Sequence, residues 1–192
     1  MRADLIVIGG SAGSLKVVLD ILPQLDANLQ TPIVIVFHRK AAVNSDMLTD
    51  LLDARSALPV KEAEDKERVI PGKIYIAPAG YHLFLEKDYS FSLDSSEKIN
   101  FSRPSIDLTF ITAADVFNNR LIGIILSGAN SDGVKGLKVI KNKGGFTIAQ
   151  EPATAEVAYM PAQAISQDAV DLIANPSEMV TIINGCRPSH NL

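Results

Sequence analysis

Residues 4–13 read Asp-Leu-Ile-Val-Ile-Gly-Gly-Ser-Ala-Gly and join a hydrophobic strand to a helix through a glycine-rich turn. The strand is the buried run Asp4–Ile8. The helix follows because apolar residues recur at helical spacing, at Leu15, Val18, Leu19 and Leu22. The glycines permit a sharp turn, which lifts Ser11 above the edge of the sheet. The helix then directs its free N–H groups at whatever Ser11 attacks, so the stretch predicts a nucleophilic serine.

Other readings of this turn are weaker. A dinucleotide-binding fingerprint starting at Gly9 would need glycines where this chain has Ser11 and Ser14, which argues against a nucleotide-binding oxidoreductase. A phosphate-binding P-loop would need a Gly-Lys-Ser/Thr ending, and Lys16 does not stand in that context. The pattern Gly-x-Ser-x-Gly fits without exceptions. It leaves open a purely structural role for Ser11 as a helix cap.

Length and composition favour one globular domain. The chain has 192 residues, with 47% hydrophobic and 21% charged residues. We expect a single domain over residues 1–186 and a flexible tail over residues 187–192. No apolar run is long enough to span a membrane, and the first strand begins too early for a signal peptide. We therefore expect a cytoplasmic protein.

Charge and cysteine content narrow the function classes further. The net charge of −4 and the absence of a basic stripe in the sequence argue against a nucleic-acid partner. Cys186 is the lone cysteine of the sequence and supports neither a disulfide nor a metal site. We expect no cofactor and no bound metal. The sequence leaves the oligomeric state open.

Strand and helix patterns alternate along the chain, which is typical of a parallel sheet covered on both faces. The predicted strands are residues 4–8, 32–37, 59–62, 73–78, 121–126 and 146–150. One predicted helix starts at a cap at Ser45, a second spans Ser105–Phe117, and a third ends at Gly144-Gly145. Two more are predicted near Pro161 and after Pro176. Residues 82–86 and 90–93 predict an antiparallel hairpin apart from the main sheet. The fold class is a doubly wound, mainly parallel α/β sheet with this small hairpin.

Three polar residues follow strong strands of this sheet. Ser11 follows the first strand, His38 the second, and Asp132 lies in the loop after the strand of residues 121–126. Ligands of open parallel sheets bind outside the carboxyl ends of the strands, where the winding direction switches. A nucleophile, a base and an acid leaving three strands at this edge predict a serine–histidine–aspartate arrangement.

Each residue also has a structural alternative. His38 could end a buried strand, and Asp132 could cap the helix that begins at Gly133. Of the other two histidines, His82 opens the hairpin and is expected at the surface, and His190 falls in the predicted tail. His38 is therefore the favoured base.

Three segments carry a resemblance to a known family. They are Ile8-Gly9-Gly10-Ser11-Ala12-Gly13, Val36-Phe37-His38, and Leu126-Ser127-Gly128-Ala129-Asn130-Ser131-Asp132-Gly133. Further segments fall between and after them in order, at residues 61–65, 75–78, 103–107, 147–151 and 160–162. Together they resemble the catalytic domain of the chemotaxis protein-glutamate methylesterases, the CheB family. The resemblance runs from the first strand to about Asn184.

This resemblance implies hydrolysis of glutamate methyl esters on the cytoplasmic helices of chemoreceptors, and in some relatives deamidation of glutamine. It implies that Ser11 attacks the ester carbonyl, that His38 takes the proton, and that Asp132 holds the imidazole. Backbone N–H groups of Ala12 and Ala129 would then bind the oxyanion.

The chain also departs from the family pattern. Ala12 stands where relatives commonly have threonine, and Ala129-Asn130 stands where they commonly have Met-Gly. Arg39-Lys40 follows the histidine, where relatives often have Met-Pro, and would draw an acidic helix to the cleft. No receiver domain precedes Ser11 in this sequence, so we expect activity that does not respond to phosphodonors. These departures keep open a non-catalytic module that binds receptors or signalling partners on the same fold.

Overall fold

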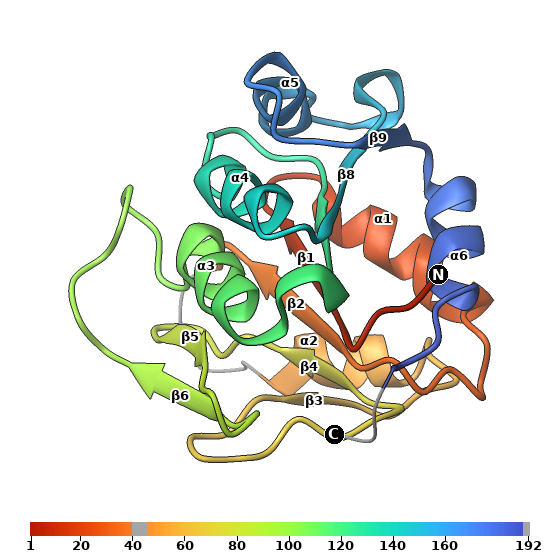
Figure 1. Cartoon of the computed structure of the whole chain (residues 1–192), viewed down its shortest axis with the longest axis vertical. Helices are drawn as coiled ribbons and strands as arrows, with labels where there is room; N and C mark the ends of the chain where they lie inside the picture. The colour runs from red at the N-terminus through yellow and green to blue at the C-terminus, as the bar shows by residue number, and fades with distance from the viewer. Residues whose placement is uncertain (40–45, 190–192) are drawn as a thin grey trace.

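The computed structural model describes residues 1–39 and 46–189, and within them seven parallel strands form the main sheet. The sheet order is β3–β4–β2–β1–β7–β8–β9, with every neighbouring pair parallel (Figure 1). The strands are β1 (Leu5–Gly10), β2 (Ile33–Phe37), β3 (Val60–Glu62), β4 (Ile74–Ile76), β7 (Leu121–Ile125), β8 (Phe146–Gln150) and β9 (Leu172–Ala174). A separate antiparallel pair consists of β5 (His82–Leu85) and β6 (Phe91–Asp94).

The helices are α1 (Ser14–Ile21), α2 (Asp46–Asp53), α3 (Ile106–Phe117), α4 (Val134–Asn142), α5 (Tyr159–Ser166) and α6 (Pro176–Asn184). Short 3₁₀ turns at Leu22–Gln24, Asn118–Arg120 and Pro152–Thr154 complete the described elements. No helix in the described part of the chain is both long and apolar enough to cross a membrane.

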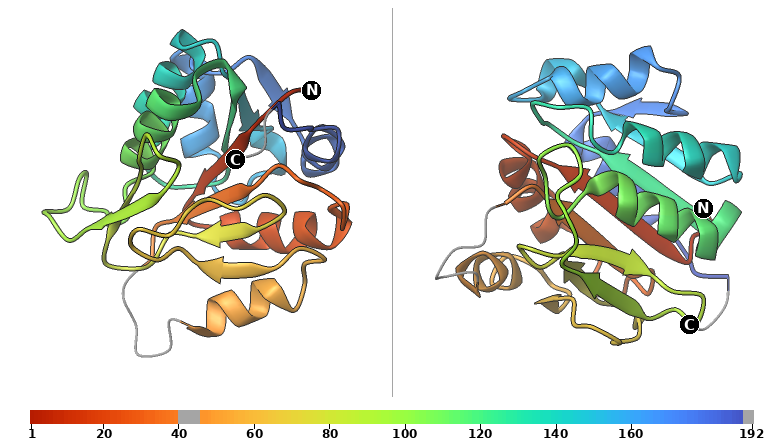
Figure 2. Two further views of the ribbon diagram at one scale, coloured as in Figure 1. Left: turned by 60° about the horizontal axis from the view of Figure 1, so that its bottom comes forward. Right: turned by 90° about the vertical axis from the view of Figure 1, so that its left-hand side faces the viewer.

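Helices cover both faces of the sheet, because successive side chains of each strand point to opposite faces. In β1, Ile6 and Ile8 pack with α1, α2 and α6, whereas Leu5 and Val7 pack with α3, α4, α5 and the hairpin. Figures 1 and 2 show these two layers on either side of the strands. Strands buried on both faces explain why β1 and β2 are continuous hydrophobic runs.

The winding direction changes at β1. The chain first builds β2, β3 and β4 on one side of β1 and then crosses over to build β7, β8 and β9 on the other. The carboxyl ends of β1, β2 and β7 therefore meet where the two halves of the fold separate. This is the position at which open α/β sheets bind ligands.

The predicted fold class is confirmed, and one strand was missed. The sequence analysis assigned no strand to β9, which has three residues and lies at the edge of the sheet. Leu172 and Ile173 are 37% and 46% exposed, so this strand lacks the continuous burial of β1, β2 and β7. The predicted cap at Ser45 lies outside the described residues, as do Lys40 and His190.

The two ends of the chain lie together. The backbone N–H of Ala3 donates to the carbonyl of Arg187, and the N–H of Arg187 donates to the carbonyl of Met1. The N–H of Ser189 donates to the carboxylate of Asp4, which is fully buried. Residues 187–189 are therefore attached to the residues that precede β1.

α3 and α4 approach closely at Gly136. A Cβ at this position would collide with the Cβ of Phe110 and would lie 3.2 Å from the carbonyl oxygen of Asp107, both on α3. The lack of a side chain lets the two helices meet, and their N-termini both reach the functional site described below.

Gly136→Ala is expected to lower the free energy of unfolding by about 1–3 kcal/mol. The added methyl group overpacks the α3–α4 contact, which outweighs the helix propensity of alanine. Urea denaturation measures the change. Lys135→Ala, on the exposed side of the same helix, is the control and should stay within about 0.5 kcal/mol of the wild type. An equal or higher stability of Gly136→Ala would contradict the close packing.

Candidate active site

Ser11 stands at the turn between β1 and α1. Gly13 has a φ of 79°, a left-handed conformation that glycine adopts without strain, and it is the N-cap residue of α1. No side chain caps this helix. The backbone carbonyl of Ser11 accepts hydrogen bonds from the N–H and the hydroxyl of Ser14, at 3.1 and 2.6 Å. Among the described residues, no group forms a hydrogen bond with the Ser11 hydroxyl, so that hydroxyl is not the cap of α1.

Ser127, which follows β7, holds this turn from the neighbouring strand. The Ser127 carbonyl accepts from the N–H of Ser11 at 2.9 Å, and the Ser127 hydroxyl donates to the carbonyl of Ala12 at 2.7 Å. The same hydroxyl accepts from the N–H of Val157 at 2.9 Å. The N–H of Ser127 itself donates to the buried side chain of Gln150 at 2.9 Å. These bonds fix the backbone on both sides of Ser11.

His38 directly follows β2, whose register aligns it with Ser11. Gly10 pairs with Phe37, and the N–H of His38 donates to the carbonyl of Gly10 at 3.2 Å. Ser11 and His38 are therefore the next residues along two adjacent parallel strands. The His38 side chain is 9% exposed, and its Nε2 lies 2.7 Å from Oδ2 of Asp132.

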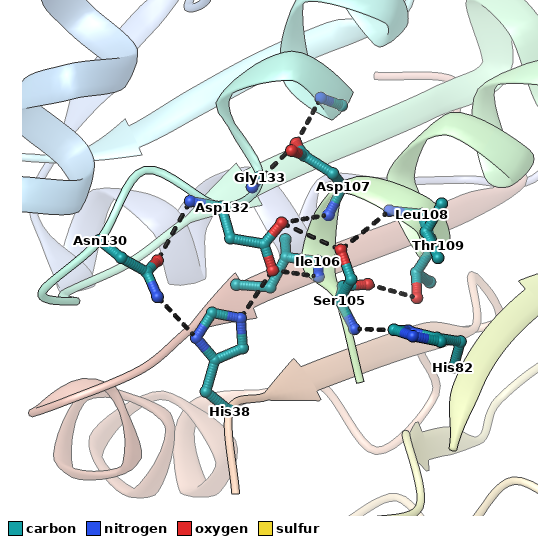
Figure 3. Close-up of polar contacts among 11 residues, drawn as sticks. His38, His82, Ser105, Ile106, Asp107, Leu108, Thr109, Asn130, Asp132 and Gly133 are labelled. Atoms are coloured by element: carbon teal, nitrogen blue, oxygen red, sulfur yellow. Dashed lines mark hydrogen bonds and ion pairs between the residues drawn. The ribbon is translucent and has the colours of Figure 1, made fainter. Parts of the chain in front are cut away.

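Asn130 fixes the tautomer of His38. Its Oδ1 accepts from the N–H of Asp132 at 3.1 Å, which assigns the amide oxygen and turns Nδ2 toward Nδ1 of His38 at 3.2 Å. An amide N–H donor at Nδ1 requires a lone pair there. The imidazole proton is therefore on Nε2, where it is donated to Asp132. Figure 3 shows His38 held between these two side chains.

Asp132 is 1% exposed and all four of its acceptor positions are used. Oδ1 accepts from the hydroxyl of Ser105 at 3.1 Å and the N–H of Asp107 at 3.0 Å. Oδ2 accepts from the N–H of Ile106 at 2.8 Å and from His38. Burial alone would raise the pKa of Asp132, but the bonds from His38 and the two backbone N–H groups hold it below the usual range.

These contacts bear on the structural alternative for Asp132, which was a cap on the helix predicted to start at Gly133. Asp132 instead accepts from the first N–H groups of α3, which is a different helix. The N-cap residue of α4 is Gly133, which has no side chain with which to cap that helix. Asp132 thus joins His38 to the N-terminus of α3, and both roles depend on one carboxylate.

Asp107 makes the reciprocal contact. It lies in the first turn of α3, and its Oδ1 accepts from the N–H groups of Gly133 and Gly136 at the start of α4, at 2.9 and 2.8 Å. Burial, with a further contribution from the negative charge of Asp132, raises the pKa of Asp107 to about 6. The two N–H donors act in the opposite direction.

His82 is buried, and the expectation that it is a surface residue was wrong. It is 0% exposed. Its Nδ1 accepts from the N–H of Ser105 at 3.1 Å, and its Nε2 faces the carbonyl of Glu97 at 3.0 Å. His82 therefore stands behind Asp132, on the far side of Ser105, and anchors the segment between β6 and α3 (Figure 3).

The predicted oxyanion donors stand in the two loops that flank this site. Ala12 follows Ser11, Ala129 lies two residues after Ser127, and both alanines are exposed. Within the described part of the chain, neither backbone N–H donates a hydrogen bond. Both donors are therefore available to a bound oxygen atom.

A cleft of about 510 Å³ opens beside His38. Its lining includes the basic side chains Arg39, Lys98 and Arg103, together with Phe101. Arg39 donates to Glu62 and, at 3.4 Å, to the carbonyl of Ala77. Of the two basic residues that follow His38, Arg39 is therefore tied to Glu62, and Lys40 lies outside the described residues.

Comparisons with known proteins show the family to which the chain belongs. The family model described as CheB methylesterase matches residues 6–183. The chain belongs to the CheB methylesterase family. The protein-glutamate methylesterase/protein-glutamine glutaminase of Thermotoga maritima is 40% identical over 176 residues, which cover 90% of this chain and 51% of that one. A Leptospira interrogans relative is 47% identical over 173 residues, or 90% of this chain and 89% of its own.

A solved structure shares the fold. The crystal structure of the Thermotoga maritima CheB methylesterase catalytic domain superposes with a TM-score of 0.90 at 36% identity. The match covers 96% of this chain and 98% of the Thermotoga chain. The chain thus spans a whole catalytic domain of the CheB family, and about half the length of the full Thermotoga relative.

Sequence reasoning did not assign roles to Asn130, Ser127, Ser105 or Asp107. Asn130 was noted only as a departure from the family's usual glycine. The other three lie within the quoted segments, at residues 126–133 and 103–107, which gave the signal that these loops matter. The segments did not predict which of these side chains bond to one another, because each hydrogen bond joins residues more than twenty positions apart.

Asp132→Asn is expected to lose activity by up to about four orders of magnitude and also to lose about 1–3 kcal/mol of stability. Asparagine has a single acceptor oxygen, so its amide NH₂ must face donors that Asp132 now satisfies. Ester hydrolysis and urea denaturation measure the two effects. Asp20→Asn, an exposed change on α1, is the control for both. Wild-type turnover in Asp132→Asn would exclude Asp132 as the residue that orients the base.

Asp107→Asn is expected to remove a pH dependence of stability. An aspartate near pKa 3.9 when unfolded and about 6 when folded binds more protons in the folded state between these values. The stability of the wild type should therefore fall as pH rises from about 4 to 7, by on the order of 1–3 kcal/mol from this group. Asparagine keeps an oxygen for the two glycine N–H groups and does not titrate. Urea denaturation of the wild type and Asp107→Asn across this pH range measures the difference. Parallel curves of stability against pH for the two proteins would contradict the raised pKa of Asp107.

Proposed function

We propose that this protein hydrolyses glutamate methyl esters on chemoreceptor helices, with Ser11 as nucleophile, His38 as base and Asp132 as the orienting acid. Membership of the CheB methylesterase family supports the activity, and the Thermotoga relative is named a protein-glutamate methylesterase. The observation that carries the residue assignment is the position of His38. It is held by Asp132 through Nε2, with a lone pair on Nδ1 and the next residue of the adjacent strand, Ser11, beside it.

The hydrogen bonds of His38 support one path for the proton. Nε2 already donates its proton to Asp132, so Nδ1 is the nitrogen that takes the proton of the Ser11 hydroxyl. Asn130 contacts the same lone pair, so the hydroxyl replaces its amide when the proton moves. The low pKa of Asp132 keeps that carboxylate ionised, and it stabilises the imidazolium that forms.

The remaining steps use the same groups. The Ser11 oxygen adds to the ester carbonyl, and the N–H groups of Ala12 and Ala129 bind the resulting oxyanion, each contributing roughly 3–4 kcal/mol. The tetrahedral intermediate collapses, and methanol leaves with the proton from Nδ1. Water then gives its proton to Nδ1 and attacks the acyl-enzyme, which releases a glutamate carboxylate and restores Ser11.

Deamidation of glutamine would follow the same path, with ammonia as the leaving group. The amide nitrogen is a poorer leaving group than methoxide oxygen, so its departure depends more strongly on proton donation from His38. The relative's name includes this second activity.

Ser11→Ala and His38→Ala are each expected to reduce methanol release from a methylated receptor fragment by at least about a thousandfold, because the members of such a triad act as a unit. The melting temperature of Ser11→Ala should stay close to that of the wild type, since the hydroxyl of Ser11 has no partner in the described residues. Gas chromatography of released methanol measures the rate.

Ser166→Ala, an exposed serine at the end of α5, is the matched control and should be fully active. If folded wild-type protein releases no methanol, the chain is a binding module on this fold rather than a hydrolase. If Ser11→Ala retains the wild-type rate, the nucleophile is another residue.

A further inference from the structure

The segment between β6 and α3, residues 95–105, contains an exposed aromatic residue with a strained backbone. Phe101 is 98% exposed and has a φ of 64°, and the preceding Asn100 has a φ of 49°. Left-handed conformations are uncommon for bulky residues, and such residues persist where the surrounding structure holds them. An aromatic side chain that is neither buried nor relaxed contributes nothing evident to the stability of the fold.

Hydrogen bonds hold this segment in place. Ile99 and Ser102 exchange two backbone bonds across the turn, at 3.1 and 2.9 Å. The guanidinium of Arg103 donates to the carbonyls of Ser95 and Ser96, which ties the two sides of the segment together. The buried His82 contacts Glu97 and Ser105 at its two ends, as described above. The tip is therefore a defined projection, visible beyond α3 in Figure 1.

This projection borders the cleft of His38. Phe101, Lys98 and Arg103 line the cleft together with the base. Of the described residues in that lining, three are basic and none is acidic. The whole chain carries a net charge of −4, so the positive lining is a local feature set against the charge of the molecule. Beside it, Ile99 presents a second partly exposed apolar side chain.

We propose that Phe101 and Lys98 form a docking surface for an acidic amphipathic helix, the helix that carries the scissile ester. This inference rests on the proposed function and adds how the substrate is recognised. An amphipathic helix presents an apolar stripe at i, i+3, i+4 and i+7, into which one aromatic ring can pack. Carboxylates on its flank complement Lys98 and Arg103. The docked helix would lie across the opening of the cleft, with its modified side chain directed to His38 and Ser11.

Phe101→Gly tests the surface without weakening the fold. Glycine accepts the positive φ without strain, so the melting temperature should not fall. The KM for a methylated receptor fragment should rise about tenfold or more, because a buried aromatic contact is lost. The kcat for a small uncharged ester, the α-methylamide of N-acetylglutamate γ-methyl ester, should stay unchanged, since Phe101 takes no part in the proposed proton transfers at His38. Phe101→Ala keeps the backbone strain and also lacks the ring, so its KM for the receptor fragment should be raised as much as that of Phe101→Gly.

Asp168→Gly is the matched control. Asp168 also has a positive φ, 54°, and it pairs with Lys141 at the end of α4 far from Asp132. The change relieves the same kind of backbone strain, and both kinetic constants should match the wild type. Lys98→Gln should lower kcat/KM on the receptor fragment at low salt and reduce its salt dependence, and the kcat for the small uncharged ester should not change.

The outcomes separate the two proposals. If wild-type protein shows no Ser11-dependent methanol release, the proposed function fails, and the docking surface with it. If the wild type is active and Phe101→Gly has the same KM for the receptor fragment, the docking surface alone is overturned. Sedimentation equilibrium addresses a second copy of the chain as occupant. A wild-type dimer that Phe101→Gly dissociates, with KM unchanged, would make the surface a contact between copies and would also overturn the proposal.

Discussion

Two buried carboxylates hold this site together, because each accepts hydrogen bonds from the start of the helix beside the other. Asp132 precedes α4 but accepts the first N–H groups of α3, and Asp107 belongs to α3 but accepts N–H groups at the start of α4. Each helix N-terminus thus gains a negative partner from the other element, which satisfies otherwise unpaired donors and complements the helix dipole. The helices can do this only because they touch along their length, and Gly136 permits that contact.

The same contacts also explain why the pKa values of these two neighbouring aspartates are shifted in opposite directions. Two carboxylates this close disfavour simultaneous ionisation. Asp132 receives four hydrogen bonds, including one from His38, whereas Asp107 accepts two through one oxygen. The pKa of Asp132 is consequently lowered while burial raises that of Asp107 to about 6. Asp132, which faces His38, therefore ionises at a lower pH than Asp107, as the proposed stabiliser of an imidazolium must.

The sequence predicted the parts of this fold that depend on local pattern. Because β1, β2 and β7 are buried on both faces, they are continuous hydrophobic runs and could be predicted as strands. The glycine-rich turn predicted that Ser11 lies at the end of a strand. Because parallel strands align their carboxyl ends, His38 and Asp132 could be expected near it. Sequence analysis did not predict β9, because this strand has only three residues and two of them are partly exposed. It did not predict the partners of Asp132 or the burial of His82 for a different reason. Both depend on where α3 begins relative to a loop far away in sequence.

A single chain of hydrogen bonds links the base to the projection at the cleft. His38 donates to Asp132, Asp132 accepts from the hydroxyl of Ser105, and the N–H of Ser105 donates to His82 (Figure 3). His82 in turn contacts the carbonyl of Glu97, four residues before Phe101. Ser105 is therefore the point at which the Asp132 carboxylate, the start of α3 and the foot of the projecting segment are joined. A substrate helix held at that projection would be positioned against the same framework that orients the imidazole, so recognition and chemistry share one set of rigid contacts.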